Sequence, residues 1–252
     1  MYHIISEPNG NAKLSRMPDG VDDVVTTGIA IAPASIGGHE VCNWRGSCAA
    51  LCIGINTGRN RMKNVRDAQI RRKRILRENP EAFRYLVIED VERYISWSER
   101  NLMSPYFRPH MYSDMPESPR GGTPEERVRD YRWLARMFSK LGVYGYTKHP
   151  TAYRWKFPVN YSLTYSWSEK SNVRTAEAYL KRGHNVSVVF AGDPPGRFDI
   201  GRSSYKVIDG DAHDYRVKRF DGQGNIIGLK FKGSAASMLR GIKSGFVNEV
   251  EK

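Results

Sequence analysis

The sequence lacks the features of a membrane-spanning or disulfide-stabilised protein. No run of 18 apolar residues is present, so we expect no transmembrane helix. The chain does not begin with a basic segment followed by an apolar one, so we expect no signal peptide. Cysteine occurs only three times, an odd number that does not form a disulfide framework. We therefore expect a cytoplasmic protein with reduced thiols.

Acidic residues are scarce relative to basic ones. The chain has 27 Asp and Glu against 40 Lys and Arg, a formal net charge of +13. Such an excess favours a polyanionic partner. We expect DNA or RNA rather than an anionic membrane, because no basic amphipathic helix carries a large apolar face.

Strand and helix patterns alternate along most of the chain. Strands are predicted at 26–32, 106–114, 143–150, 160–169, 185–193, 205–214 and 225–233. Helices are predicted at 64–79, 80–103, 124–141, 173–182 and 234–250. The alternation predicts a single α/β domain, either a complete or partial TIM-like (βα) barrel or an open sheet. Its parts would be a cysteine loop at 25–63 and a barrel body at 64–252.

Ionisable side chains gather where the predicted strands end. In a parallel α/β fold these ends form the usual position of an active site. The candidate catalytic residues are Asp114, Lys148, His149, Asp209 and Asp211. Helix capping is the alternative role for any single one of them.

All three cysteines lie within eleven residues, in the segment "VCNWRGSCAALCIG". Cys42, Cys48 and Cys52 are spaced Cys-x5-Cys-x3-Cys, and Cys48 and Cys52 would share one helical face. The spacing matches neither a zinc ribbon nor the common radical-SAM motif. We predict that the three thiolates bind a metal, either zinc or a [4Fe–4S] cluster. Buried structural thiols, or a redox or nucleophilic role, are the alternatives.

Two further patterns suit a nucleic-acid partner. A basic run follows the cysteines, and its phosphate-contact candidates are Arg59, Arg61, Lys63, Arg66, Arg71, Arg72, Lys73 and Arg74. Aromatic residues crowd 144–167 among cations, and the candidates for base stacking are Tyr146, Trp155 and Trp167. A solvated helix face and ordinary core packing are the respective alternatives.

Several short motifs occur in an order that resembles a family of phage proteins labelled gene-product-88-like. They include "IAIAPAS", the three cysteines, "TGRNRMKNVRDAQIRRKR", "MYSD", "YTKHP", "NYSLTYSWSE" and "VIDGDAHD", and they cover roughly residues 25–235. The resemblance implies a phage origin, a location in the infected host cell and a barrel-like α/β fold. It implies no particular reaction.

Two reactions are compatible with these residues. The favoured hypothesis is a base-modifying transferase that resembles the guanine transglycosylases and exchanges guanine in DNA for a 7-deazaguanine. Asp211 or Asp209 would then be the nucleophile and Asp114 would bind the base or transfer its proton, while Lys148 and His149 would position phosphate or the leaving group. Such an enzyme would act on a base outside the stack and take a small deazapurine as co-substrate.

The alternative enzyme resembles a small radical-SAM protein with a [4Fe–4S] cluster, and only this alternative would use SAM. A non-enzymatic nucleic-acid-binding protein with a structural metal is the third possibility.

Overall fold

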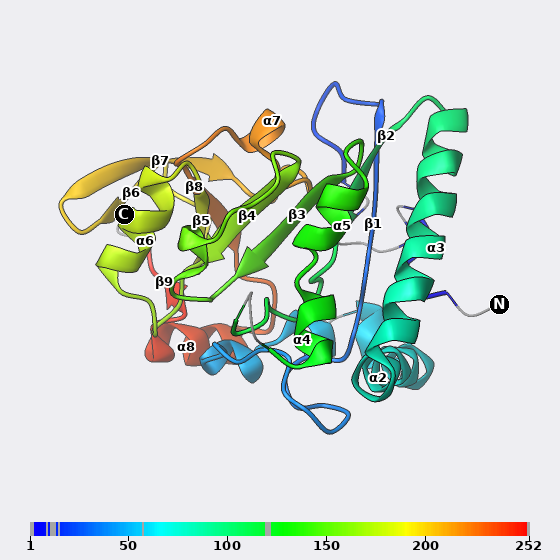
Figure 1. Ribbon diagram of the computed structural model, residues 1–252. Helices are drawn as coiled ribbons and strands as arrows, with labels where there is room; N and C mark the ends of the chain where they lie inside the picture. The colour runs from blue at the N-terminus through cyan, green and yellow to red at the C-terminus, as the bar shows by residue number, and fades with distance from the viewer. Residues whose placement is uncertain are drawn as a thin grey trace.

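Parallel strands that follow one another along the chain form most of the sheet. The computed structural model describes residues 3–8, 10, 14, 16–56, 58–118 and 122–250, so the last two residues of the predicted body 64–252 lie outside this part. The nine described strands pair in the order β1-β2-β3-β4-β5-β8-β7-β6, and β9 also pairs with β5 (Figure 1). Their bounds are Val24–Gly28, Ser104–Arg108, Gly142–Thr147, Tyr161–Ser166, Asn185–Phe190, Arg197–Ile200, Ser203–Asp209, Ile226–Lys230 and Val247–Asn248 for β1 to β9.

Helices lie in most of the connections between these strands. The described α-helices α1 to α8 span Ile53–Asn56, Lys63–Glu78, Pro80–Arg100, Pro124–Arg129, Arg132–Met137, Val173–Lys181, Lys218–Asp221 and Ala235–Ser244. The 3-10 helices η1 to η3 span Ser47–Ala49, Gly58–Arg61 and Ala152–Arg154. Figure 1 shows α2 and α3 at the side of the sheet next to β1, with α8 beside the cysteine segment. In the described part of the chain, no helix is both long and apolar enough to cross a membrane.

The sheet is open rather than closed into a barrel. Every strand pair from β1 through β5, β8 and β7 is parallel, but β6 joins β7 in an antiparallel hairpin. No pairing between β1 and β6 closes the sheet among the described residues. The predicted α/β architecture is therefore confirmed and the closed TIM-like barrel is not, because the hairpin ends the sheet at β6.

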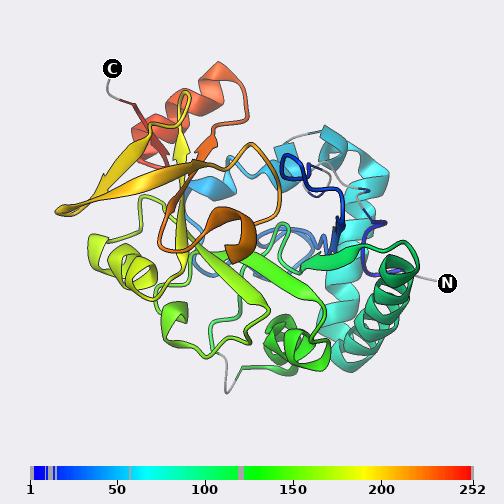
Figure 2. The ribbon, with the colours of Figure 1, turned by 90° about the horizontal axis from the view of Figure 1, so that it is seen from above.

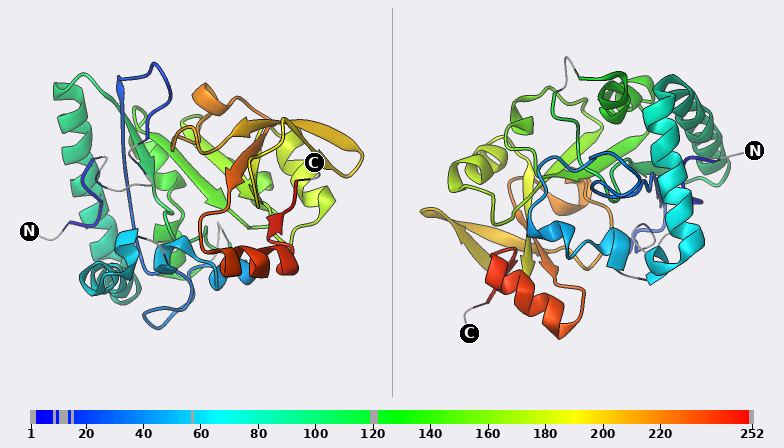
Figure 3. Two further views of the ribbon diagram at one scale, coloured as in Figure 1. Left: turned by 180° about the vertical axis from the view of Figure 1, so that it is seen from behind. Right: turned by 90° about the horizontal axis from the view of Figure 1, so that it is seen from below.

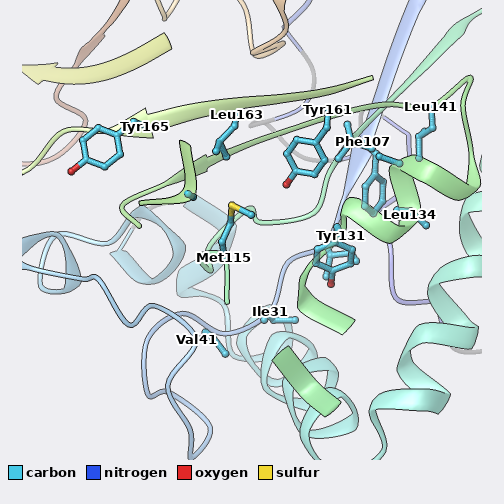
Figure 4. Packing of buried hydrophobic residues seen from close by; sticks show 14 of the residues in the cluster. Ile31, Val41, Phe107, Met115, Tyr131, Leu134, Leu141, Tyr161, Leu163 and Tyr165 are labelled. Carbon is cyan, nitrogen blue, oxygen red and sulfur yellow. The ribbon is translucent and has the colours of Figure 1, made fainter. Parts of the chain in front are cut away.

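The two faces of the sheet are buried by different partners. Phe107 of β2 faces the helices and contacts Tyr131, and Leu134, Tyr161 and Leu163 belong to the same core cluster (Figure 4). The neighbouring Tyr106 points to the other face, because alternate residues of a strand face opposite sides. There its ring lies 5.4 Å from that of Tyr215, in the segment that leads to α7. Figure 2 shows this α7 segment, in orange, above the strands.

Several predicted elements differ from the observed ones. The first strand ends at Gly28, so Ile29 and Ile31 lie beyond it in buried chain, and β2 ends at Arg108 because Pro109 follows. The helix predicted at 124–141 is two short helices, α4 and α5, separated at Asp130, whose carboxylate accepts hydrogen bonds from Arg132. The hairpin strand β6 and the two-residue strand β9 carry no clear pattern in the sequence.

Candidate functional site

One cavity lies at the carboxyl ends of the strands, and it contains most of the predicted site. It has a volume of about 290 Å³ and is lined by residues at or directly after the ends of β2, β3, β4, β5, β7 and β8. The cysteine loop forms another wall, and Figure 3 shows this loop beside α8 in the view from below. The position agrees with the general location of ligand sites in open α/β sheets.

All three cysteines line this cavity. Cys42 lies in the loop after β1, while Cys48 is in η1 and Cys52 directly precedes α1. The Cys42 thiol donates a hydrogen bond to the carbonyl of Tyr112 over 3.6 Å. Burial raises the pKa of Cys42 to about 12 and also raises the pKa of Cys52. Both groups are therefore protonated thiols at neutral pH.

Carboxylates on both sides of the loop hold its backbone. Glu40 accepts hydrogen bonds from the Val41 and Cys42 amides, and its other oxygen pairs with Arg45 at 2.9 Å. Glu169 accepts the Ser47 amide at 2.6 Å, at the start of the turn that contains Cys48.

The chain approaches Glu169 closely at Gly46. A Cβ at Gly46 would overlap the Glu169 carboxylate, so a larger residue there would displace this side chain from the Ser47 amide.

Asp114 lies at the cavity, but its carboxylate is fully engaged within the protein. One carboxylate oxygen accepts hydrogen bonds from the Met115 amide and the Thr147 hydroxyl, both at 2.7 Å. The other oxygen accepts a hydrogen bond from the Lys148 amide at 2.9 Å. The residue is 6% exposed, and Arg129 donates to its carbonyl. Asp114 thus ties the segment after β2 to the end of β3, which is a structural role.

His149 is also engaged within the protein, and it is not among the cavity-lining residues. Its Nδ1 accepts the Thr151 amide, which leaves Nε2 to donate to the carbonyl of Glu117 at 2.9 Å. The ring packs between Trp44 and Trp155. The predicted role in positioning phosphate or a leaving group does not suit this buried imidazole, because both nitrogens already have partners.

Lys148 and Asp211 are predicted catalytic residues that line the cavity together with Asp114. The Lys148 ammonium donates to the Ser166 hydroxyl at 2.7 Å, and its charge acts to lower the pKa of Cys52. Asp211 accepts the Lys230 amide at 2.8 Å and pairs with Lys232 at 2.5 Å. Asp209 accepts the amide of Asp211 and does not line the cavity.

The basic run lies apart from the cavity. Its side chains are exposed at Arg59, Arg61, Lys63, Arg66, Arg71 and Arg74, and none of the run lines the cavity. Lys73 is fully buried, where its ammonium donates to the carbonyls of Ala34 and Ile36. Arg72 is half-buried and donates to the carbonyl of Ala30. These two side chains hold the loop before Cys42, so neither suits the predicted contact with phosphate.

Only one of the three predicted stacking residues reaches the cavity. Tyr146 lines it, with the Arg108 guanidinium 4.9 Å from the ring centroid. Trp155 stacks beneath Arg132 and against His149, and Trp167 packs against the main core cluster. Both tryptophans are therefore packing residues, which was the alternative role for this segment.

The sequence analysis did not select several residues that build the site. Arg108 and Arg216 line the cavity, as do Tyr112 and Phe246. Arg108 ends β2 directly before a proline, and this position could have identified it as a strand-end residue. Arg216 follows the acidic strand end by two residues, but no local pattern distinguishes it from a surface arginine.

Within the described residues, no group of three or more His, Cys, Asp or Glu side chains is placed so that it could hold a metal ion. The predicted zinc or cluster on Cys42, Cys48 and Cys52 stays a prediction, supported by the shared cavity and by the thiol chemistry.

Comparisons with known proteins identify the family alone. No curated protein and no solved structure matches the chain. A family model described as "Gene product 88" matches residues 5–249, which include every strand of the sheet and the whole cavity. The sequence motifs and this match agree, and the chain belongs to the Gene product 88 family of phage proteins.

Proposed function

We propose that this protein is a base-modifying enzyme whose reactive centre is an iron–sulfur cluster on Cys42, Cys48 and Cys52. The observation that carries the proposal is that all three cysteines line one cavity at the carboxyl ends of six strands. A cluster needs thiols around a common space and an adjacent substrate site, and the cavity offers both.

The chemistry of the donors suits such a cluster, because thiolates are the usual ligands of iron–sulfur centres. The three thiols come from one short segment, and Glu40 and Glu169 hold the backbone of that segment. Binding would have to draw the three sulfur atoms together, since the described residues contain no group of three placed to hold a metal ion. When bound, a cluster with three cysteine ligands supplies an iron that is open to a substrate, together with one-electron chemistry.

The protein's own residues prepare the surroundings of the thiols. Lys148 places a positive charge near Cys52, which favours the thiolate that metal binding requires. Cys42 is half-buried, and this burial raises the pKa of its thiol. Glu40 and Glu169 fix the two ends of the turn between Cys42 and Cys48. The cavity wall therefore presents cysteine side chains that stay protonated as thiols until a metal ion binds.

Guanine exchange in DNA is the second candidate. Asp211 favours it, since its carboxylate lies on the cavity wall and could attack the sugar C1′ of an extruded nucleotide. Asp114 would bind the base or transfer its proton in this reaction, and it would have to exchange a hydrogen bond with Met115, Thr147 or Lys148 to do so. This candidate predicts that DNA treated with the protein and a 7-deazaguanine gains the modified base, as measured by nucleoside mass spectrometry. Asp211→Asn would abolish the gain.

Metal analysis of anaerobically purified protein tests the favoured proposal. We expect a brown protein that absorbs near about 400 nm and contains about four irons per chain after reconstitution. Cys42→Ser, Cys48→Ser and Cys52→Ser should each lose most of this iron. Ser47→Ala is the matched control in the same loop and should retain it.

A colourless protein without iron after reconstitution would overturn the cluster. Zinc bound at one equivalent through the same cysteines would instead support the non-enzymatic structural metal. Release of 5′-deoxyadenosine from SAM by the iron-loaded protein would assign the radical-SAM type of reaction.

A further inference from the structure

The cavity wall that faces away from the cysteine loop contains two arginines. Arg108 is the last residue of β2, and its guanidinium lies over the ring of Tyr146 in β3. Arg216 lies between β7 and α7 and lines the same cavity. Burial raises the pKa of the Tyr146 hydroxyl, and the charges of Arg216 and Arg108 both act to lower it. The Arg108 guanidinium therefore lies against the Tyr146 ring, and Arg216 lines the same cavity.

The two arginines differ in how their charge is balanced. Arg216 is fully buried and held by Asp221 at 3.2 Å and by the Nδ1 of His213 at 3.0 Å. Arg108 has no carboxylate partner among the described residues, and its buried Nε has no hydrogen-bond partner there either. A buried guanidinium donor without a partner is costly, so the geometry indicates an external acceptor.

Two basic side chains at the cavity have no carboxylate partner in the described chain. Six basic side chains and three carboxylates of the described chain line the cavity. Four of these basic groups pair with lining or neighbouring carboxylates: Lys232 with Asp211, Lys230 with Asp193, Arg45 with Glu40 and Arg216 with Asp221. Asp214 also lines the cavity and accepts the Arg16 amide. Arg108 and Lys148 are left with no described carboxylate partner, and Lys148 follows Tyr146 by two residues on the same side of β3.

Part of the wall is apolar and suits a planar organic group. Met111, Val189, Leu229 and Phe246 line it together with Leu51 and Ile53 of the cysteine segment. A volume of about 290 Å³ is at the small end of the range for small-molecule sites and leaves no room for a duplex.

We propose that Arg108, Arg216 and Tyr146 form a phosphate subsite, and that the ligand is a nucleoside monophosphate, free or as one unit of a single strand. The phosphate accepts hydrogen bonds from the free edge of Arg108, and the base lies along the apolar wall toward the cysteines. The naming of this ligand as substrate rests on the proposed function, whereas its binding does not require a metal.

Isothermal titration calorimetry on the full chain tests the subsite. We expect guanosine monophosphate to bind at least about tenfold more tightly than guanosine, because the nucleoside lacks the charge-assisted hydrogen bonds. Arg108→Ala should weaken binding of the monophosphate by about tenfold or more and leave the affinity for the nucleoside unchanged. Arg108→Lys should give an intermediate loss, since it keeps the charge without the fork geometry.

Arg100→Ala is the control, because Arg100 is an exposed arginine at the end of α3 outside the cavity. A short single-stranded oligonucleotide forms the second arm of the experiment. Tighter, Arg108-dependent binding of the oligonucleotide would identify the strand as the source of the phosphate, and tighter binding of the monophosphate would identify the free nucleotide.

Equal affinity for nucleotide and nucleoside, or binding that is unchanged in a folded Arg108→Ala variant, would overturn the subsite. The same titrations on Cys42→Ser protein separate this result from the cluster proposal. Arg108-dependent binding there supports the subsite even if no sample contains iron, and iron without such binding refutes the subsite alone.

Discussion

Lys73 lies in α2, with its ammonium against the loop that leads to Cys42. It belongs to a run of eight basic candidates for phosphate contact, yet its side chain is buried and binds two carbonyls of the chain before Cys42. Burial lowers its pKa to about 8. A single lysine therefore fixes the loop that delivers the first cysteine to the cavity.

We expect Lys73→Met to destabilise the protein by about 1–3 kcal/mol, because it leaves the carbonyls of Ala34 and Ile36 without donors. Arg74→Met, at the exposed next position of α2, should change the free energy of unfolding by less than about 0.5 kcal/mol. Urea unfolding followed by fluorescence measures both values. Equal stability of the two variants would contradict the assigned role.

The sequence predicts which residue types gather at the strand ends, but not which of them are already engaged. Asp114 and His149 lie where the pattern places them, and both have all of their hydrogen-bonding atoms occupied by the protein. Their partners come from segments up to 34 residues away, as for Asp114 and Lys148. Periodicity is a local property, so it does not report such long-range contacts.

The N-terminus of α4 is an element that local rules predict in detail. Thr123 accepts the Glu126 amide, the Glu126 carboxylate accepts the Thr123 amide, and Pro124 occupies the first turn. The same short helix carries Arg129, which donates to the carbonyls of Val41 and Asp114. The cap therefore supports the cavity wall as well as the helix.

Thr123→Ala should lower the free energy of unfolding by about 0.5–2 kcal/mol through loss of the cap. Thr123→Ser keeps the hydroxyl and should retain most of the stability. Thermal unfolding by circular dichroism compares the two variants. An alanine variant as stable as the serine variant would show that the cap contributes nothing measurable.

Other boundaries depend on tertiary contacts that a local pattern does not contain. The apolar periodicity of 124–141 suits one helix, but the chain breaks at Asp130 and turns so that Tyr131 and Leu134 both reach the core. β6 is mostly exposed and lacks a buried face that would mark it, whereas its partner β7 overlaps the strand predicted at 205–214.

At the scale of the whole molecule, strand order places the cavity. Because β1 to β5 pair in chain order and all run parallel, their carboxyl ends meet at one edge and bring the cysteine loop opposite Arg108 and Tyr146. The sequence predicts this alternation and hence the edge. Closure of the sheet is a different matter, since it depends on how β6 and β7 pair with each other.

Two buried histidines make the stability of the whole fold dependent on pH. Burial lowers the pKa of His110 to about 3 and that of His184 to about 4. The positive charge of Arg129 lowers the pKa of His110 further, and the charges of Lys218 and Arg182 lower that of His184. The imidazole of His110 also contacts Ser113 and the ring of Tyr131, and neither supplies a negative charge. The folded protein therefore resists protonation at both residues, while the unfolded chain accepts protons near pH 6.5.

The difference between the folded and unfolded pKa values of these histidines stabilises the folded protein above about pH 6.5. This stabilisation is lost as the pH falls toward 4. The buried pair of His213 and Asp221 contributes in opposite directions, because burial lowers the pKa of the histidine and raises that of the aspartate. We therefore expect the free energy of unfolding to fall by about 2–4 kcal/mol between pH 7 and pH 5, from His110 and His184 alone.

Urea unfolding at pH 7, 6 and 5 measures the fall, and His184→Asn should reduce it by about half. The difference in slope between the variant and the parent is the deciding quantity, since loss of the contacts with Phe157 and Tyr179 lowers stability equally at every pH. A parent protein whose stability is constant from pH 7 to pH 5 would refute the assignment of both histidines as buried neutral groups. A variant with the parent's slope would refute it for His184 and leave His110 and the pair of His213 and Asp221 as the source of the dependence.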